Sequence, residues 1–455
     1  MSEERPYWNM EIEPLLNTPT MRALQWEKLQ YTLRFAYDEV PFDRERMEAA
    51  GVTPADIRSL DDFARALRPC GQADFRTVFE RFDLDMDKVW LHLFGQRRMD
   101  DLYLLTTTSG TTGVPTPYPV FHQTTELMAE IMARVGWRAN IRPGTRLAVG
   151  FGLSMHAAGT PHLFWFMKTR GVTLIPIGAE AGTERMLQFL KLFKANALSC
   201  TPSLALYLIE KSPEVVGHPV KDLGIRTLMC GAEPGAGIPE IRGRLEHEYG
   251  ARVFDVGAGY GVSCDHPQYQ GMHWVADDSC LYELVDPETF EPVPITDRAI
   301  GLACFTPLPP ESAIFFHHLR FTLNDIHQVF TDPCPCGLSG FRYKIVGRAD
   351  DMLKVKGVPV YPAAIQAVIN GFVPRVTGVF RIVLTEKPPL VIPPLKLKIE
   401  RGEGVPEAEV PALQREIENK MHTMVKVRPA ITWLEPNTLE RAVKKTQLLE
   451  KQYEQ

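Results

Sequence analysis

The chain has 455 residues, of which 45% are hydrophobic and 23% are charged, and its formal net charge is −6. The length predicts two or more domains with a large core, and the composition is typical of a globular protein. Proteins that bind nucleic acids usually carry an excess of positive charge, so this charge balance argues against a nucleic-acid partner.

The N-terminus, MSEERPYWNM, is polar and acidic, which is not the pattern of a signal peptide. The most apolar run, Leu163–Met167, is far too short to span a bilayer. We therefore expect a cytoplasmic protein without membrane contact, whose eight scattered cysteines are reduced.

Helical spacing of leucines predicts helices over Met21–Ala50 and Leu60–Leu67. After residue 120, helices and strands alternate. The expected helices are His122–Trp137, Ala158–Arg170, Thr183–Ala195, Ser203–Lys211 and Pro239–Tyr249, and the expected strands are Arg146–Gly152, Val172–Gly178, Ala197–Thr201, Thr227–Cys230 and Arg252–Val256. This alternation predicts an α/β fold with mostly parallel, helix-covered sheets, which bind ligands at the carboxyl ends of their strands.

The pattern changes after Leu281. A hairpin with its turn at Asp286–Thr289 and β-like runs over Ala299–Phe305 and Ile314–Phe321 predict a β-rich subdomain. Two further strands, Gly378–Thr385 and Leu395–Glu400, and an amphipathic helix over Glu407–Val425 predict a small α+β domain at the C-terminal end.

The stretch Leu104–Tyr118, LLTTTSGTTGVPTPY, is the first candidate ligand site. Its glycines and hydroxyl side chains could wrap around an anion; they are Thr108, Ser109, Gly110, Thr111, Thr112 and Gly113. It is not a Walker loop, because it lacks Gly-Lys-Ser/Thr and Pro115 prevents an immediate helix. By itself, the cluster is more typical of a polar turn between strands.

The segment TSGTTGVP resembles the phosphate-binding loop of the adenylate-forming superfamily. From LQYTLRFAYDEVPFDRERMEAAGV to a lysine pair near the C-terminal end, the chain is most similar to phenylacetate-CoA ligases. The resemblance implies two reactions. With the help of Mg²⁺, an aromatic or related carboxylic acid reacts with ATP to form an acyl-adenylate, and the acyl-adenylate then reacts with CoA. It also implies an ATP- and acid-binding domain over 1–349 and a mobile C-terminal domain over 350–455, and leaves a homodimer open.

The same resemblance assigns site residues. Asp325, in LRFTLNDIHQV, and Arg348, in VGRADD, match ribose contacts, and a carboxylate can accept hydrogen bonds from both ribose hydroxyls. Lys445 aligns with the catalytic lysine, whose cation would bridge the substrate carboxylate and the α-phosphate. The other implied positions are Gly231, Ala232, Glu233, Pro234 and Tyr260 at the adenine and ribose, Ser263 at the phosphate, His156, Gly257 and Ala258 in the acid pocket, Asp350 at the hinge, and Lys356 and Gly357 facing CoA.

Several positions depart from the family pattern. Cys264 stands at the position of the glutamate that usually holds Mg²⁺ in the motif Y-G-x-T/S-E, and Asp265 follows it. The usual lysine of the phosphate loop is Val114, and the glycine before the catalytic lysine is Lys444. How Mg²⁺ is held therefore stays open at this point.

The cysteines suggest a second metal. Cys264, Cys334 and Cys336 could form a tetrahedral zinc site with one histidine, either His273 or His266. Some phenylacetate-CoA ligase-like proteins have such a histidine in a Gly-Leu-His run, which Gly271-Met272-His273 resembles, so we prefer His273. Four protein ligands would make the zinc structural. The alternative is a set of reduced side chains that bind no metal.

Two alternative functions remain from the sequence. In one, the chain adenylates its substrate but uses an acceptor other than CoA, such as a phenolic oxygen. In the other, it is a degenerate homologue that binds nucleotide without turnover.

Overall fold

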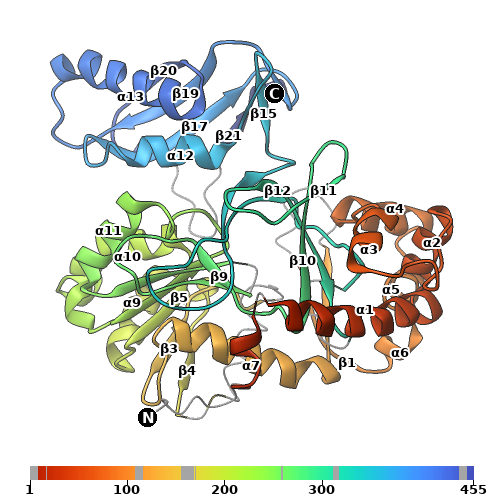
Figure 1. Cartoon of the computed structure of the whole chain (residues 1–455). Coiled ribbons are helices and arrows are strands. Elements are labelled where there is room, and N and C mark those ends of the chain that lie inside the picture. Colours follow the sequence, from red (N-terminus) through yellow and green to blue (C-terminus); the bar gives the residue numbers. More distant parts are fainter. Residues whose placement is uncertain are drawn as a thin grey trace.

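The structure is a computed structural model, and it describes residues 9–16, 18–107, 116–154, 169, 171–257, 260–310, 317–439 and 448–454. A large body contains the N-terminal and central parts of the chain. The C-terminal part, shown in blue in Figure 1, forms a separate unit above it.

One twelve-stranded sheet crosses the large body, in the order β11-β10-β12-β13-β14-β9-β8-β7-β6-β5-β3-β4. Its parallel half consists of β3 (Arg146–Val149), β4 (Thr173–Pro176), β5 (Ala197–Cys200), β6 (Thr227–Gly231) and β7 (Arg252–Gly257). Its antiparallel half consists of β8 (Gly261–Ser263), β9 (Met272–Trp274), β10 (Cys280–Val285), β11 (Pro292–Val293), β12 (Ile300–Pro307), β13 (Asp325–Phe330) and β14 (Arg342–Arg348).

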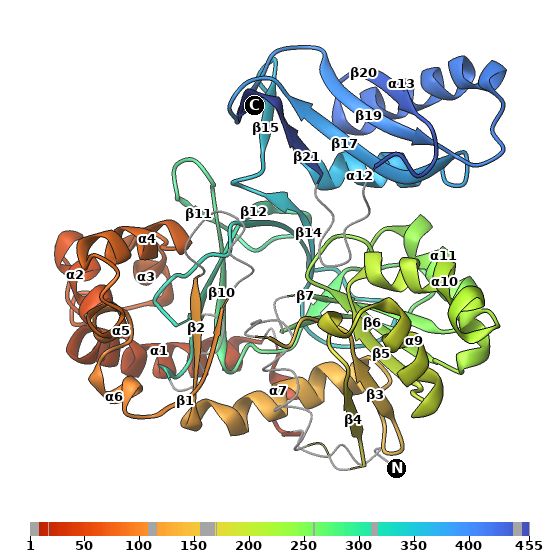
Figure 2. The same cartoon turned by 180° about the vertical axis from the view of Figure 1, so that it is seen from behind.

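The parallel half has a core on each face, as the period of two in a strand requires. Leu147 and Met229 pack in a core with α7 (Thr125–Arg138). Their neighbours Ala148 and Leu228 pack in the core of α9, α10 and α11, and Figure 2 shows these helices together beside the sheet. The bounds of these helices are Thr183–Leu192, Pro202–Val216 and Pro239–Tyr249. The predicted helix–strand alternation is therefore confirmed over this region.

Six helices form the N-terminal end, which lies beside the antiparallel half of the sheet (Figure 1). They are α1 (Pro19–Glu39), α2 (Pro41–Ala49), α3 (Leu60–Ala66), α4 (Gln72–Arg81), α5 (Met86–Phe94) and α6 (Gln96–Met99). The single helix predicted over residues 21–50 is two helices. Pro41 lacks the N–H that would continue α1, and it begins α2 instead.

A separate antiparallel pair, β1 (Leu102–Thr107) and β2 (Pro117–Phe121), holds both ends of the predicted phosphate loop, with Thr107 opposite Pro117. The loop residues 108–115 lie outside the described residues. So does nearly all of the helix predicted over Ala158–Arg170.

Two expectations for the central region were wrong in detail. Strands β10 to β14 extend the main sheet and do not form a sheet of their own. Residues 317–321 are not a strand. They form a turn in which Arg320 has a φ of 53°, and only Phe321 makes an isolated bridge, to Phe305.

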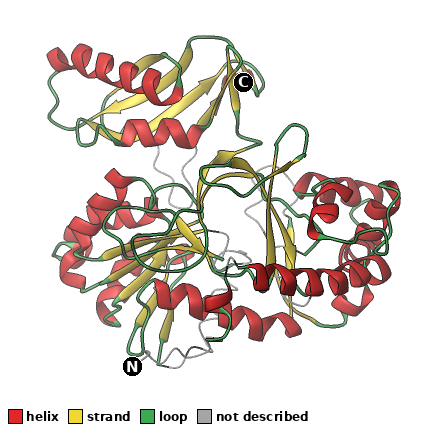
Figure 3. Cartoon of the chain, in the orientation of Figure 1, coloured by secondary structure: helices red, strands yellow, loops and turns green. Residues whose placement is uncertain are grey.

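The C-terminal unit has two small sheets, β16-β15-β18 and β20-β19-β17-β21, and two helices (Figure 3). The strands are β15 (Leu353–Val355), β16 (Val358–Val360), β17 (Val376–Leu384), β18 (Leu390–Val391), β19 (Leu395–Arg401), β20 (Pro429–Leu434) and β21 (Leu449–Lys451), and the helices are α12 (Pro362–Asn370) and α13 (Val410–Val425). A hydrophobic core of its own fills this unit. Among the helices of the described residues, none is long and apolar enough to cross a bilayer.

Candidate functional site

The end of β6 opens into the segment predicted to contact adenine. Gly231 is the last residue of β6, and a Cβ there would overlap the carbonyl oxygen of Val256, so this close approach of two strands requires glycine. Ala232 follows in the left-handed region with a φ of 67°, and it is exposed. The chain thus turns sharply at the carboxyl edge of the sheet, where parallel sheets bind ligands.

Glu233 has an anchoring role in this segment. Its Oε1 accepts a hydrogen bond of 2.7 Å from the backbone N–H of Ser203, in the first turn of α10. A carboxylate at this position also interacts favourably with the positive end of the helix dipole. The side chain therefore holds the segment on α10, and the exposed Ala232 and Pro234 are left at the surface.

The structure brings the predicted ribose pair together. Asp325 begins β13, Arg348 ends β14, and the two residues are directly opposite in the antiparallel register. Arg348 Nη1 lies 3.9 Å from Asp325 Oδ1. Asn324, just before the strand, has a φ of 67°, a conformation that asparagine tolerates better than most residues.

Tyr118 links this pair to the predicted phosphate loop. Burial raises the pKa of Tyr118, whereas the hydrogen bond that Gln72 donates to its Oη and the charge of Arg348 lower this pKa, and the charge of Asp325 raises it. Tyr118 belongs to β2, which begins two residues after the loop ends. It closes the predicted stretch Leu104–Tyr118, but the sequence did not indicate that it would reach the ribose pair.

Arg348 is also bound to the predicted hinge residue. Its Nε donates to Asp350 Oδ1 at 2.9 Å and its Nη2 donates to Oδ2 at 2.6 Å, while Asp351 lies 3.6 Å from Nε. Burial would lower the pKa of Arg348, but the hydrogen bond and charge of Asp350 and the charges of the other two aspartates raise it. The guanidinium is therefore a permanent cation between Asp325 and Asp350.

Two predicted nucleotide contacts are placed differently from the expectation. The ring of Tyr260 is only 2% exposed and packs 5.5 Å from the ring of Trp274, so no open ring face is available for a base. Ser263 is 1% exposed, and its Oγ accepts a hydrogen bond of 2.9 Å from Asp255 N–H. Both belong to a segment that folds back along β7, which draws their side chains into the sheet.

Gly257, predicted in the acid pocket, ends β7. Its carbonyl oxygen accepts a hydrogen bond of 3.1 Å from Tyr343 Oη. A Cβ at Gly257 would lie only 2.9 Å from Tyr343 Oη. A buried tyrosine therefore underlies this turn. The remaining predicted site residues lie outside the described residues: Thr108, Ser109, Gly110, Thr111, Thr112, Gly113, His156, Ala258 and Lys445.

The structure gathers the four preferred zinc ligands. The ligand atoms of Cys264, His273, Cys334 and Cys336 all lie within 4.8 Å of one another. The two sulfur atoms of Cys264 and Cys334 are 3.8 Å apart, and Cys336 Sγ is 3.4 Å from His273 Nε2. His266 is not in the cluster, and its Nδ1 accepts a hydrogen bond from Gln268 N–H at 3.2 Å.

Burial raises the pKa of the Cys264 thiol and raises the pKa of Cys336 to about 12, so both groups are neutral thiols when no metal is bound. The N–H of Leu338 donates to Cys336 Sγ at 3.4 Å. The buried guanidinium groups of Arg138 and Arg342 both act on His273, and burial together with these charges lowers the pKa of His273 to about 3. The imidazole is therefore neutral at physiological pH, the form that binds metals.

The residues at the family's Mg²⁺ position do not fit that ion. Cys264 belongs to the sulfur cluster. Asp265 forms an ion pair with Arg252, at the first residue of β7. The carboxyl end of that strand, at Gly257, is five residues further, or about 16 Å away. This motif therefore supplies no Mg²⁺ ligand near the nucleotide.

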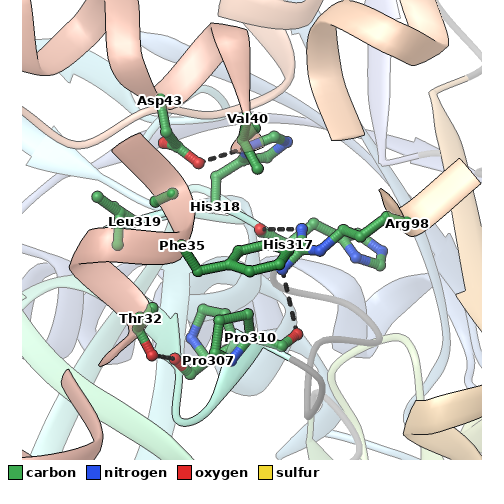
Figure 4. A pocket seen from close by; sticks show the side chains of 11 residues that line it. Thr32, Phe35, Val40, Asp43, Arg98, Pro307, Pro310, His317, His318 and Leu319 are labelled. Atoms are coloured by element: carbon green, nitrogen blue, oxygen red, sulfur yellow. Dashed lines mark hydrogen bonds and ion pairs between the residues drawn. The ribbon is translucent and has the colours of Figure 1, made fainter. Parts of the chain in front are cut away.

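A small cavity lies elsewhere, between the N-terminal helices and the chain around β12 (Figure 4). His318 Nδ1 is 3.0 Å from Asp43 Oδ2 in its wall. The cavity, of about 10 Å³, is just large enough for one water molecule. None of the predicted site residues lines it, so it is not the candidate active site.

Two family models match the chain. One, described as AMP-binding enzyme, covers residues 44–264, and the other, AMP-binding enzyme C-terminal domain, covers residues 357–451. Together with the fold and the ribose pair, they define the class: the chain is an AMP-forming acid–CoA ligase. The phenylacetate-coenzyme A ligase of Thermus thermophilus is 30% identical to it over 457 residues, covering 95% of this chain and 97% of the relative. The chain therefore belongs to the phenylacetate-CoA ligase family.

Solved structures add a comparison of domain arrangement. A crystal structure of 2-hydroxyisobutyryl-CoA ligase in the postadenylation state, in complex with R3-HIB-AMP, has a TM-score of 0.85 at 25% identity and covers 100% of this chain and 94% of its own. An open conformation of the same ligase, in complex with 2-HIB-AMP and CoA, has a TM-score of 0.69 at 25% identity and covers 99% of this chain and 95% of its own. The present arrangement is therefore closer to the postadenylation state.

Proposed function

We propose that the chain converts an aromatic or related carboxylic acid to its CoA thioester in two half-reactions. In the first, a carboxylate oxygen attacks the α-phosphorus of ATP, the bond to the β-phosphate oxygen breaks, and pyrophosphate leaves. In the second, the deprotonated thiol of CoA attacks the acyl carbon, the C–O bond to AMP breaks, and AMP leaves. The substrate class follows the phenylacetate ligase relatives.

The observation that carries this proposal is the juxtaposition of Asp325 and Arg348, whose charges also act on the buried Tyr118 of β2. The carboxylate can accept hydrogen bonds from ribose hydroxyls, and the guanidinium can donate to them. The same strand β2 leads back to the loop 108–115, whose residues would hold the phosphates. One nucleotide could therefore span from the loop to the ribose pair.

The roles of several residues are part of this proposal. Lys445 would bridge the carboxylate and the α-phosphate and so stabilise the charge that develops during adenylation. His156, Gly257 and Ala258 would line the acid pocket. We propose no route through Mg²⁺ at the Cys264 position, because those residues do not fit it.

The second half-reaction would require the C-terminal domain, residues 350–455, to rotate about Asp350. Lys356 and Gly357 form the two-residue loop between β15 and β16, with φ angles of 50° and 80°, which is the conformation of a type I′ hairpin. Both residues are exposed at its tip. After rotation, this tip would face CoA.

A screen of aryl and short-chain acids tests the function. Pyrophosphate release should require an acid, and AMP release should increase strongly when CoA is added. Release of AMP that does not increase when CoA is added would favour a different acceptor, such as a phenolic oxygen. No release with any acid would contradict the proposal and favour a homologue without turnover.

We also propose that the sulfur cluster holds one structural zinc ion. Tetrahedral zinc with Zn–S bonds of about 2.3 Å separates two sulfur atoms by about 3.8 Å, and it separates sulfur from imidazole nitrogen by about 3.5 Å. The distances of 3.8 Å and 3.4 Å in the cluster match both values. Three thiolates and one zinc ion carry a net charge of −1, which the neighbouring Arg138 and Arg342 would balance. All eight cysteines are free thiols, which suits the reducing cytoplasm as the compartment.

A further inference from the structure

An ion pair joins the C-terminal unit to the large body. Lys354 Nζ donates to Glu288 Oε1 at 2.8 Å, across 66 residues of sequence. We propose that Glu288 and Lys354 are a positioning pair that favours the domain arrangement of the first half-reaction over that of the second. This inference rests on the proposed two-step function.

Glu288 is held in a rigid turn of the large body. Asp286 Oδ1 accepts hydrogen bonds from the N–H groups of Glu288 and Thr289, at 2.9 Å and 2.8 Å. Phe290 N–H donates to the Asp286 carbonyl at 2.9 Å, and the Arg68 guanidinium lies 4.5 Å from the centre of the Phe290 ring. The backbone that carries Glu288 is therefore hydrogen-bonded within the turn between β10 and β11.

Lys354 is equally well fixed in the C-terminal unit. It is the central residue of β15, and its neighbours Leu353 and Val355 are buried in the core of that unit. Its backbone N–H donates to the Pro389 carbonyl at 2.5 Å. The ion pair therefore connects two well-packed bodies through one side chain from each.

The pair can exist only in some domain arrangements. Lys354 is four residues after Asp350, so it lies at most about 14 Å along the chain from the proposed hinge. A rotation there moves Lys354 with the C-terminal unit, whereas Glu288 stays with the large body. The two states of 2-hydroxyisobutyryl-CoA ligase match this chain with TM-scores of 0.85 and 0.69, so the relative does change its arrangement.

An apolar contact supports the same arrangement. Tyr361, at the start of α12, packs against Gly347 of β14, where any Cβ would overlap its ring. The ion pair adds its own contribution to the stability of this domain arrangement. The side chains of Lys354 and Glu288 are 36% and 69% exposed, and pairs this exposed change an equilibrium by roughly two- to fivefold. Such a weak pair biases the arrangement without locking it.

The test measures the two half-reactions separately: acid-dependent pyrophosphate exchange, and CoA transfer from a synthetic acyl-adenylate. In Glu288→Gln, the ratio of the first rate to the second should fall roughly two- to fivefold, and this effect should shrink at high salt. The double variant Glu288→Lys/Lys354→Glu should restore the ratio. Glu291→Gln, which changes an exposed glutamate of the same hairpin, is the matched control and should leave the ratio unchanged.

An unchanged ratio in Glu288→Gln, or no rescue by the double variant, would overturn the proposal. Hydrogen exchange gives a readout that does not depend on activity. Backbone amides of residues 286–291 and 353–360 should exchange faster in Glu288→Gln than in the wild type or in Glu291→Gln. Absence of turnover with every acid would contradict the proposed function alone, and equal exchange in all variants would contradict the positioning pair.

Discussion

Arg348 shows how one side chain can serve two purposes. It lies opposite Asp325, the proposed ribose contact, and holds Asp350 through two hydrogen bonds. A nucleotide that takes one of these guanidinium contacts must compete with an aspartate. Binding of ATP is therefore expected to loosen the hinge residue.

Arg348→Met should weaken ATP binding. Hydrogen bonds to charged groups contribute about 1.5–3 kcal/mol, which corresponds to roughly a 10- to 150-fold higher KM for ATP. Arg348→Lys should recover only part of this loss, because lysine cannot donate the paired bonds. Steady-state kinetics at saturating acid and CoA measure the effect, and an unchanged KM for ATP in Arg348→Met would contradict the ribose assignment.

Lys445→Ala should separate the two half-reactions. If its cation acts on the α-phosphate, ATP-dependent adenylation should fall by about 10²- to 10³-fold, the usual cost of removing one transition-state contact. Transfer from a synthetic acyl-adenylate to CoA should survive. Lys444→Ala is the control at the neighbouring residue. If Lys444→Ala lost adenylation and Lys445→Ala kept it, the catalytic role would belong to Lys444.

Asp255 is expected to make stability depend on pH. Burial raises its pKa to about 6, and the Tyr269 hydroxyl donates to it at 2.7 Å. The pKa of Asp255 is higher in the folded state than in the unfolded state. Its contribution to the free energy of unfolding is therefore complete below about pH 4 and is lost as the pH rises through about 6. The wild type should lose about 1–2 kcal/mol more than Asp255→Asn over this range. Urea unfolding at pH 4.5 and pH 7 measures this difference, and equal slopes would contradict it.

At the scale of secondary structure, the sulfur cluster joins the segment after β8, strand β9 and the β13–β14 connection. The ribose pair lies at the other end of β13, five residues or about 17 Å from Phe330. Zinc at the cluster would therefore hold the strands in register without contacting the reacting atoms.

Cys334→Ser should lose zinc and melt earlier, by roughly 5 °C or more, because a structural metal contributes several kcal/mol to folding. Cys200→Ser, in β5, should keep one zinc ion per chain. His273→Ala should lose the metal, and His266→Ala should retain it. Elemental analysis of protein purified without added metal decides the matter, and a folded, fully reduced protein with essentially no zinc would exclude the site.

At the scale of the whole molecule, the proposed two-step function requires the C-terminal unit to change its orientation relative to the large body. The C-terminal unit has its own core, and the described contacts that join it to the large body include the Lys354–Glu288 pair and the packing of Tyr361.

Asp350→Pro should stop one half-reaction and spare the other, because proline fixes φ at the proposed hinge. Asp350→Ala removes the same ion pair with Arg348 but leaves the backbone free, so it should retain both. Normal overall turnover in Asp350→Pro would show that the units do not rotate at this residue.

The sequence by itself predicted the order of helices and strands in the parallel half, because alternating apolar patterns depend on local spacing. It also grouped Asp325 with Arg348, and Cys264 and His273 with the two later cysteines, and the structure brings each of these groups together. Their roles at a ribose and a zinc ion stay predictions. It did not predict that β10 to β14 join the main sheet, since that depends on pairing between distant strands.

Tertiary structure alone decided where individual side chains point. Glu233 binds the first turn of α10, and Tyr260 is buried against Trp274, although the family resemblance predicts that both contact the nucleotide. Only folding brings Lys354 to Glu288. Motifs specify which chemical groups are present, whereas strand register and the packing of distant segments determine which of these groups meet and which remain accessible to a ligand.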